Sequence, residues 1–185
     1  MESAQAAVSH PPETFETARL RLRRPTMADA PDIFEYASDP EVTRYLNFTT
    51  HKALNTVEEF LRGLLTAMEQ GGRYGWAMTL SGSDRLIGMV EIRIQPPRAE
   101  LGYVLGKTYW GQGYMVEAVR PIVEWALGQG AIHRVWAFCD ADNRGSARVL
   151  EKVGMEREGT LRKWAMSPNL SDAPRDCHCY SIVRG

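Results

Sequence analysis

Trp110-Gly111-Gln112-Gly113-Tyr114-Met115 stands between an apolar, strand-like run, Leu101-Gly102-Tyr103-Val104-Leu105, and a helix-patterned run over residues 116–127. A strand, a glycine-rich turn and a helix N-terminus present several free backbone N–H groups to one point. Those N–H groups and the helix dipole both favour an anion. The stretch therefore predicts a binding site for a phosphorylated cofactor.

Three kinds of phosphate-binding loop compete for this stretch. A nucleotide P-loop needs Gly-Lys-Ser/Thr, because its lysine and hydroxyl contact phosphate and magnesium, whereas Gly113 is followed by Tyr114 and Met115. A dinucleotide-binding fingerprint needs a third glycine three residues after Gly113, and that position is Val116. The sequence therefore favours the third kind, which is the pyrophosphate loop of an acyl-coenzyme A binder.

The composition is that of a soluble globular chain without a strong charge bias. Of the 185 residues, 44% are hydrophobic and 24% are charged, and the formal net charge is −1. This balance does not indicate nucleic acid or an anionic membrane as a partner. No apolar run approaches the roughly 20 residues that a membrane span needs, and residues 1–16 lack the pattern of a signal peptide. With an odd number of cysteines, three, we expect a cytoplasmic protein with reduced thiols.

Residues 1–16 are expected to form a flexible N-terminal tail, and residues 17–185 a single domain. Within the domain, Thr26 is expected to cap one helix, and Thr56 with Glu59 forms a capping-box pattern before another. Apolar spacings of period 2 predict strands, and spacings of period 3.6 predict helices. The expected strands are residues 19–23, 74–80, 85–94, 99–105, 135–139, 155–164 and 177–183, and the expected helices are residues 28–38, 56–70, 116–127 and 146–153.

This order of elements predicts an α/β fold of the α+β type. The central sheet is expected to be mixed and mostly antiparallel, with about 7 strands and with helices packed on it.

Four stretches of the chain resemble the GNAT acetyltransferases, and within that family the ribosomal-protein alanine N-acetyltransferases and their relatives. The first is Arg19-Leu20-Arg21-Leu22-Arg23-Arg24-Pro25, followed by Asp29-Ala30 and Asp39-Pro40-Glu41-Val42. The second runs from Leu101 through the glycine-rich turn to Glu117-Ala118. The third is Asn143-Arg144-Gly145-Ser146-Ala147-Arg148-Val149-Leu150-Glu151-Lys152-Val153-Gly154-Met155, and the fourth is residues 176–183. They occur in the family's order and cover residues 19–184, which is nearly the whole chain.

The resemblance implies the GNAT fold, with helices on both faces of the sheet and with acetyl-coenzyme A, the cosubstrate, between two splayed strands. Residues 99–105 and 135–139 match those strands. Where the two strands separate, backbone N–H and C=O groups have no strand partner. The pantetheine arm hydrogen-bonds to these groups as an added strand would. Met115 stands where the family usually has Gly or Ala, and its side chain is expected to point away from the loop. The resemblance assigns pantetheine to the backbone of Tyr103, Val104 and Leu105 and to Asn143, and the pyrophosphate to the amides of Gly111, Gln112, Gly113, Tyr114 and Met115.

Ser146 and Glu100 are the candidate catalytic residues, both by resemblance. Ser146 opens the last helix and would donate a proton to the departing thiolate, whereas the alternative interpretation of Asn143 and Ser146 is helix capping alone. Glu100 lies on the cofactor strand where some family members have a general base, and its alternative interpretation is a solvated edge carboxylate. Side chains alternate between the two faces of a strand, so the place of Glu100 in the strand decides on which face of the sheet its carboxylate lies. Glu91, or a base acting through water, is the other alternative.

The function that the resemblance implies is N-acetyl transfer from acetyl-coenzyme A to a primary amine, which makes the protein an acyltransferase. The favoured acceptor is a protein N-terminus, as in the ribosomal-protein branch. Small amines such as polyamines, amino acids or antibiotics are alternative acceptors, and a non-catalytic acyl-coenzyme A sensor is an alternative function. We expect the acceptor site at the first two helices, residues 45–51 and residues 167–175, in a monomer or homodimer.

Cys177-His178-Cys179 has the composition of a metal cluster but not its geometry. On a strand, Cys177 and Cys179 face one way and His178 faces the other. No second pair of ligands has zinc spacing. We therefore expect no metal site.

Overall fold

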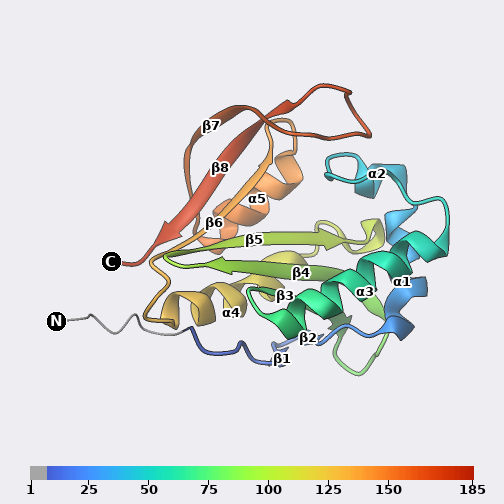
Figure 1. The fold of residues 1–185 in the computed structure, drawn as a ribbon, viewed down its shortest axis with the longest axis horizontal. Coiled ribbons are helices and arrows are strands. Elements are labelled where there is room, and N and C mark those ends of the chain that lie inside the picture. The colour runs from blue at the N-terminus through green and yellow to red at the C-terminus, as the bar shows by residue number, and fades with distance from the viewer. Residues whose placement is uncertain (1–7) are drawn as a thin grey trace.

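The computed structural model describes residues 8–185, which form one eight-stranded sheet with helices on both faces (Figure 1). The strand order is β1-β2-β3-β4-β5-β6-β8-β7. Within this sheet β5 and β6 run parallel, and every other neighbouring pair is antiparallel. The expected fold class is confirmed, and the eighth strand is β1, which is too short to show a period in the sequence. The strands are β1 (Thr14–Glu16), β2 (Leu20–Arg23), β3 (Arg73–Leu80), β4 (Leu86–Gln95), β5 (Arg98–Leu105), β6 (Arg134–Asp140), β7 (Glu156–Ala165) and β8 (Arg175–Val183).

Two helical layers bury the two faces of the sheet. Val119 and Ile122 of α4 lie in a core cluster that also contains strand residues and part of α5, which we call the α4–α5 cluster. Leu61 and Leu64 of α3 pack with Met89 of β4 in a second core cluster, the α1–α3 cluster. Figure 1 shows α3 in front of the sheet and α4 behind it. The helices are α1 (Ala30–Ala37), α2 (Pro40–Thr43), α3 (Leu54–Gln70), α4 (Tyr114–Gly128) and α5 (Arg144–Val153), with 3₁₀ turns η1 (Met27–Asp29) and η2 (Lys107–Tyr109).

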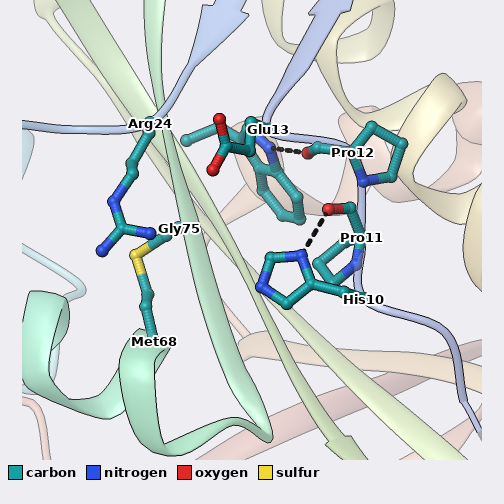
Figure 2. A pocket seen from close by; sticks show the side chains of 8 residues that line it. His10, Pro11, Pro12, Glu13, Arg24, Met68 and Gly75 are labelled. Atoms are coloured by element: carbon teal, nitrogen blue, oxygen red, sulfur yellow. Dashed lines mark hydrogen bonds between the residues drawn. The ribbon is translucent and has the colours of Figure 1, made fainter.

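Residues 8–16 lie against the domain instead of forming part of a flexible tail. β1 pairs with β2, and the buried Trp76 indole N–H donates to the Pro12 carbonyl at 2.9 Å. Figure 2 shows the small crevice that this segment lines together with Arg24, Met68 and Gly75, none of which belongs to the glycine-rich turn. The expected tail, residues 1–16, therefore ends earlier, because a buried indole N–H needs an acceptor and this segment supplies it. Residues 1–7 lie outside the described part of the chain.

The starts of the first helices differ in part from the sequence prediction. The Thr26 N–H donates to Asp29 Oδ2 at 2.7 Å, in keeping with a capped start. Thr56, by contrast, lies inside α3, which begins at Leu54, and its hydroxyl donates to the Ala53 carbonyl at 2.7 Å. The capping-box prediction for Thr56 is therefore wrong by one helical turn. The four residues of α2 are too few to show a helical period, so the sequence did not predict this helix.

β5 and β6 part from one another and form a fork. Backbone pairing joins them at three positions only, Arg98 with Arg134, Ala99 with Val135 and Glu100 with Trp136. Beyond these positions, residues 101–105 and 137–140 have no strand partner across the fork within the described chain. Figure 1 shows the two strands diverging as a V. The splayed strands implied by the resemblance are therefore present.

The Cys177-His178-Cys179 run follows the alternation expected of a strand. Cys177 and Cys179 are buried, whereas the His178 ring lies 3.1 Å from the Thr160 hydroxyl. Within residues 8–185, no three His, Cys, Asp or Glu side chains are placed to hold one metal ion. Among the helices of the same residues, none is both long and apolar enough to cross a membrane.

Candidate active site

The glycine-rich turn connects β5 and η2 to the start of α4. Gly111 and Gly113 have φ angles of +75° and +82°, which favour glycine because side chains with a Cβ are strained there. Gly113 is the N-cap of α4, so the N–H groups of the first helical turn point forward without helical acceptors. The Trp110 indole donates to the Leu105 carbonyl at 2.8 Å and ties the turn to the end of β5. The turn thus has the geometry of an anion-binding site.

Met115 stands at the end of the turn, where the resemblance implies a smaller residue. The Met115 side chain is 4% exposed and lies in the α4–α5 cluster. It therefore adds no bulk on the open side of the turn, where an anion would bind. The structure thus agrees with the expectation that the side chain points away from the loop.

An ion pair between Arg19 and Glu117 holds the turn against β2. Arg19 Nε donates to Glu117 at 2.7 Å, and the Thr17 hydroxyl donates to the same carboxylate at 2.6 Å. Burial raises the pKa of the Glu117 carboxyl, but the hydrogen bonds from Thr17 and Arg19 lower it more, so the net shift is downward. Arg19 also donates to the Gln112 carbonyl at 3.1 Å and lies 4.4 Å from the Tyr114 ring centre. No local pattern indicates this support, because Arg19 and Glu117 are 98 residues apart.

The backbone of Tyr103, Val104 and Leu105 lines the fork. Tyr103 and Leu105 direct their side chains to the α4–α5 cluster, and Val104 directs its side chain to the α1–α3 cluster. On one side these residues pair with β4, and on the fork side they have no strand partner in the described chain. Unpaired backbone groups of this kind suit a ligand that adds like a strand. The three residues therefore fit the pantetheine contacts that the resemblance assigns.

Ser146, Asn143 and Tyr103 meet beside the fork. The Ser146 N–H donates to Asn143 Oδ1 at 3.0 Å, so Asn143 caps α5. The Tyr103 hydroxyl lies 2.8 Å from Ser146 Oγ and donates to the Ser146 carbonyl at 3.1 Å. Burial raises the pKa of Tyr103, and the bond to Ser146 lowers it by less, so the phenol stays protonated. Capping uses the backbone of Ser146 and leaves its hydroxyl for another role.

Glu100 stands at the closed end of the fork, because it is the last residue of β5 that pairs with β6. Its carboxylate forms an ion pair with Arg93 of β4 at 3.1 Å. Glu91, two positions before Arg93, forms an ion pair with Arg73 at 2.8 Å. In the β4–β5 register, Glu100 lies opposite Arg93 and Glu91 lies opposite Gly102, so both carboxylates share one face of the sheet.

The fork separates the two candidate proton-transfer groups onto opposite faces. Ala99 and Leu101 point into the α4–α5 cluster, so Glu100 between them points to the α1–α3 face. Tyr103 points to the α4–α5 face, where it meets Ser146. Glu100 and the Ser146 hydroxyl therefore lie on opposite faces of the sheet at the fork.

We expect Glu100→Gln to lower kcat about 100-fold and to remove the acid limb of the pH–rate profile, because the amide cannot accept a proton. Arg93 keeps a carboxylate partner in this variant, since Glu91 lies 3.7 Å from it. Measuring kcat/KM against pH for Glu100→Gln and for Glu91→Gln separates the two carboxylates. An unaltered profile in Glu100→Gln would assign the base role to Glu91 or to water.

The β7–β8 loop lies beside the segment that joins α2 to α3, as Figure 1 shows. Asn169 of the loop holds the two together, because its Nδ2 donates to the Thr43 carbonyl at 2.7 Å and to the Phe48 carbonyl at 2.8 Å. Its Oδ1 accepts the Thr50 N–H at 2.9 Å. The two segments expected to border the acceptor site are thus joined by one side chain.

Aromatic side chains of β6 and β7 form an apolar surface on the face that carries Glu100. The Phe138 ring centre lies 6.1 Å from that of Trp136 and 6.1 Å from that of Trp164. The register pairs Trp136 with Glu100, so the aromatic surface begins at the closed end of the fork. Trp164 is 50% exposed and lies at the outer end of this surface. The helices on this face pack mainly on β3 and β4, and Trp136 and Phe138 are half-buried.

Comparison with known proteins shows that the chain belongs to the GNAT acetyltransferase family. A family model described as an acetyltransferase (GNAT) domain matches residues 19–156. The N-acetyltransferase p20 of Bacillus licheniformis is 29% identical over 155 residues, which cover 82% of this chain and 87% of p20. A GNAT-family acetyltransferase from Bacillus anthracis has a similar structure, with a TM-score of 0.79, 26% identity and coverage of 92% and 98% of the two chains. The protein is therefore an N-acetyltransferase.

Two neighbours at 18% identity share the fold and hold a coenzyme A species. One is RimL, a ribosomal L7/L12 alpha-N-protein acetyltransferase in complex with coenzyme A, with a TM-score of 0.81 and coverage of 92% and 98%. The other is the microcin C7 self-immunity acetyltransferase MccE in complex with acetyl-CoA and AMP, with a TM-score of 0.82 and coverage of 96% and 100%. At this identity the likeness concerns the fold alone.

Proposed function

We propose that this N-acetyltransferase moves the acetyl group of acetyl-coenzyme A to the α-amine of a protein N-terminus. The observation that carries the proposal is the fork, with Ser146 on one face and Glu100 beside a partly exposed aromatic surface on the other. A protein terminus needs an open approach, because the residues that follow the amine must leave the site. Trp164, half exposed, offers apolar contact along such an approach. RimL, which shares the fold, is a ribosomal L7/L12 alpha-N-protein acetyltransferase.

The turn and the fork bind and orient the donor. The backbone N–H groups of residues 111–115 receive the pyrophosphate, and the backbone of residues 103–105 receives the pantetheine arm, with Asn143 at the mouth. A backbone N–H near Val104 or Leu105 polarises the carbonyl that the amine attacks. Acetyl-coenzyme A supplies the activated thioester. Holding two reactants in this way contributes on the order of 7–11 kcal/mol.

Two proton transfers accompany the exchange of a C–S bond for a C–N bond. Glu100 accepts the proton that the amine loses, directly or through a water molecule. Ser146 donates a proton to the departing sulfur, so the products are an amide and a thiol. Tyr103, 2.8 Å from Ser146 Oγ, orients the serine hydroxyl for this transfer.

A small amine is the second candidate acceptor. MccE, which shares the fold, is a microcin self-immunity acetyltransferase. On the acceptor face, Glu91 and Glu100 would also attract a polyamine. Both carboxylates are held by arginines, which reduces the negative potential available to such a cation.

A coenzyme A release assay over a panel of amines distinguishes these acceptors. The panel contains peptides with free Ala, Ser, Thr and Met N-termini, the same peptides with blocked N-termini, polyamines, amino acids and aminoglycosides. We expect the highest kcat/KM with free peptide N-termini and no release with blocked ones. Release with small amines alone would contradict the protein acceptor. Binding of acetyl-coenzyme A without release in any reaction would favour the sensor.

We expect Asn169→Ala to raise KM for the acceptor with little change in acetyl-coenzyme A affinity. The substitution leaves two carbonyls and the Thr50 N–H without their partner, so the free energy of unfolding should fall by about 1–3 kcal/mol. Steady-state kinetics with each substrate varied, together with urea unfolding, checks both effects. Asn55→Ala, at an exposed position of α3, is the matched control. Equal losses in acceptor and donor binding would show that Asn169 supports the whole fold instead.

A further inference from the structure

β7 loses its register with β8 near the C-terminal end of the strand. Residues 162–164 of β7 lie opposite the single residue Asp176 of β8, so β7 carries two extra residues and forms a bulge. Regular pairing flanks the bulge on both sides, at Leu161 with Cys177 and at Ala165 with Arg175. The bulge adjoins the β7–β8 loop, which we expect to border the acceptor site.

The backbone of this bulge is strained and is held in place by a side chain. Lys163 has a φ angle of +50° and is the one residue other than glycine with a positive φ in residues 8–185. Residues with a Cβ are disfavoured in this left-handed region. The Asp176 carboxylate accepts the Lys163 N–H at 2.9 Å, which holds the backbone in this conformation. Strained conformations persist where neighbouring contacts fix them, and they are common at functional sites.

Side chains that lie opposite one another on β6 and β8 share a face of the sheet. Phe138 lies between Ala137 and Cys139, which belong to the α4–α5 cluster, so its ring lies on the α1–α3 face. The register places Cys179 opposite Phe138, so Cys179 lies on the same face. Cys177, two positions away on β8, shares that face.

The bulge changes the face toward which Trp164 points. Leu161 lies opposite Cys177 on the α1–α3 face, and strict alternation from Leu161 would put Trp164 on the α4–α5 face. The Trp164 ring centre lies instead 6.1 Å from that of Phe138. The left-handed turn at Lys163 therefore directs the tryptophan toward the face that carries Glu100.

Trp164 is within reach of the residues that follow an amine bound at the fork. Trp136, which pairs with Glu100 at the closed end of the fork, begins a row of three rings that continues through Phe138 to Trp164. The path along these rings is about 12 Å, the rise of three to four residues of an extended chain. The exposed half of Trp164 is at the outer end of that path.

We propose that Trp164 is a specificity-determining residue, which the β7 bulge places to bind an apolar side chain at one of positions 2–5 of the acceptor's N-terminal segment. This inference rests on the proposed protein acceptor. An indole ring offers a large, rigid apolar surface to such a side chain. An acceptor that consists of one residue does not extend to this surface, so Trp164 adds nothing to its turnover.

A coenzyme A release assay with a peptide series tests the specificity. Each peptide has eight residues, a free alanine N-terminus and a Gly/Ser sequence in which one leucine is moved through positions 2–8, and alaninamide serves as the acceptor without further residues. The variants are Trp164→Ala and Trp164→Phe. Val183→Ala removes another exposed apolar side chain, at the far end of β8, and is the matched control.

We expect the wild-type enzyme to prefer leucine at one of positions 2–5 over leucine at position 8 by about fivefold to tenfold in kcat/KM, through a lower KM. Trp164→Ala should lose this preference, Trp164→Phe should keep part of it, and Val183→Ala should keep all of it. Turnover of alaninamide should be the same in the four proteins.

Two further variants test the role of the bulge. Asp176→Ala removes the acceptor of the Lys163 N–H and should weaken the leucine preference, whereas Asp176→Asn keeps an acceptor oxygen and should restore it. Thermal unfolding verifies that both variants are folded. An unchanged preference in Asp176→Ala would overturn the positioning role of the bulge.

Equal kcat/KM of the wild-type enzyme for all leucine positions would overturn the specificity and leave the protein acceptor standing. A preference that survives in Trp164→Ala, or an equal loss of alaninamide turnover in that variant, would also overturn it. Release with alaninamide but with none of the peptides would overturn the protein acceptor, and the specificity with it.

Discussion

Ser146→Ala is expected to lower kcat about 100- to 1,000-fold, the usual contribution of a general acid. Without the hydroxyl, the thiolate must leave without a proton donor held beside the fork. The cap of α5 survives, because it uses the Ser146 N–H and Asn143 Oδ1. The Tyr103 hydroxyl also keeps an acceptor, the carbonyl of residue 146 at 3.1 Å, so no buried donor is left unsatisfied.

Stopped-flow and steady-state kinetics with saturating acetyl-coenzyme A measure this loss, and thermal unfolding verifies that the variant is folded. Ser83→Ala, which removes a serine hydroxyl in the β3–β4 turn, is the control and should retain full turnover. Normal kcat in folded Ser146→Ala would leave the serine with its capping role alone. A rise in KM for acetyl-coenzyme A at constant kcat would assign it to donor binding.

Gly88→Ala is expected to lower the free energy of unfolding by about 2–4 kcal/mol, because a side chain at this position meets backbone. A Cβ on Gly88 would lie 2.5 Å from the Val104 carbonyl oxygen and 3.1 Å from Leu105 Cα. Neither neighbour is a flexible side chain, so β4 and β5 would have to move apart. Because β5 supplies the fork, we also expect weaker binding of acetyl-coenzyme A.

Urea unfolding followed by tryptophan fluorescence, and calorimetric titration with acetyl-coenzyme A, measure the two effects of Gly88→Ala. Gly159→Ala in β7 is the matched control, since a Cβ there meets no atom within 4 Å. The free energy of unfolding of Gly159→Ala should change little or rise slightly, because alanine gives the unfolded chain less conformational entropy than glycine does. If Gly88→Ala is as stable as Gly159→Ala, the close approach of β4 and β5 is not a constraint.

The layered fold was predictable because its long elements carry their period in the sequence. α3 places Val57, Leu61, Leu64 and Met68 inward at helical spacing, and these residues are buried as the pattern indicates. β1 and α2, with three and four residues, are too short for a period and were missed. The N-terminal segment was also missed, because its order depends on the Trp76 indole 64 residues away.

The candidate site, like the fold, has one part that the sequence predicts and another that it does not. The glycine-rich turn was predictable because its glycines, its strand and its helix are consecutive. Two other parts of the site were not predictable, because they join residues that are distant in the sequence. They are the contact between Ser146 and Tyr103, 43 residues apart, and the hydrogen bonds of Asn169, which span up to 126 residues. The sequence also did not decide on which face of the sheet Glu100 lies, because this depends on the register of β4 with β5.

The order of residues alone implies a strand, an anion-binding turn and a helix, because backbone conformation there depends on neighbours in the chain. It also implies the family, through four stretches in sequence. Folding decides which groups flank the fork and which segments Asn169 joins. Those arrangements arise from contacts between distant segments, whose geometry depends on sheet register and helix packing and leaves no local periodicity.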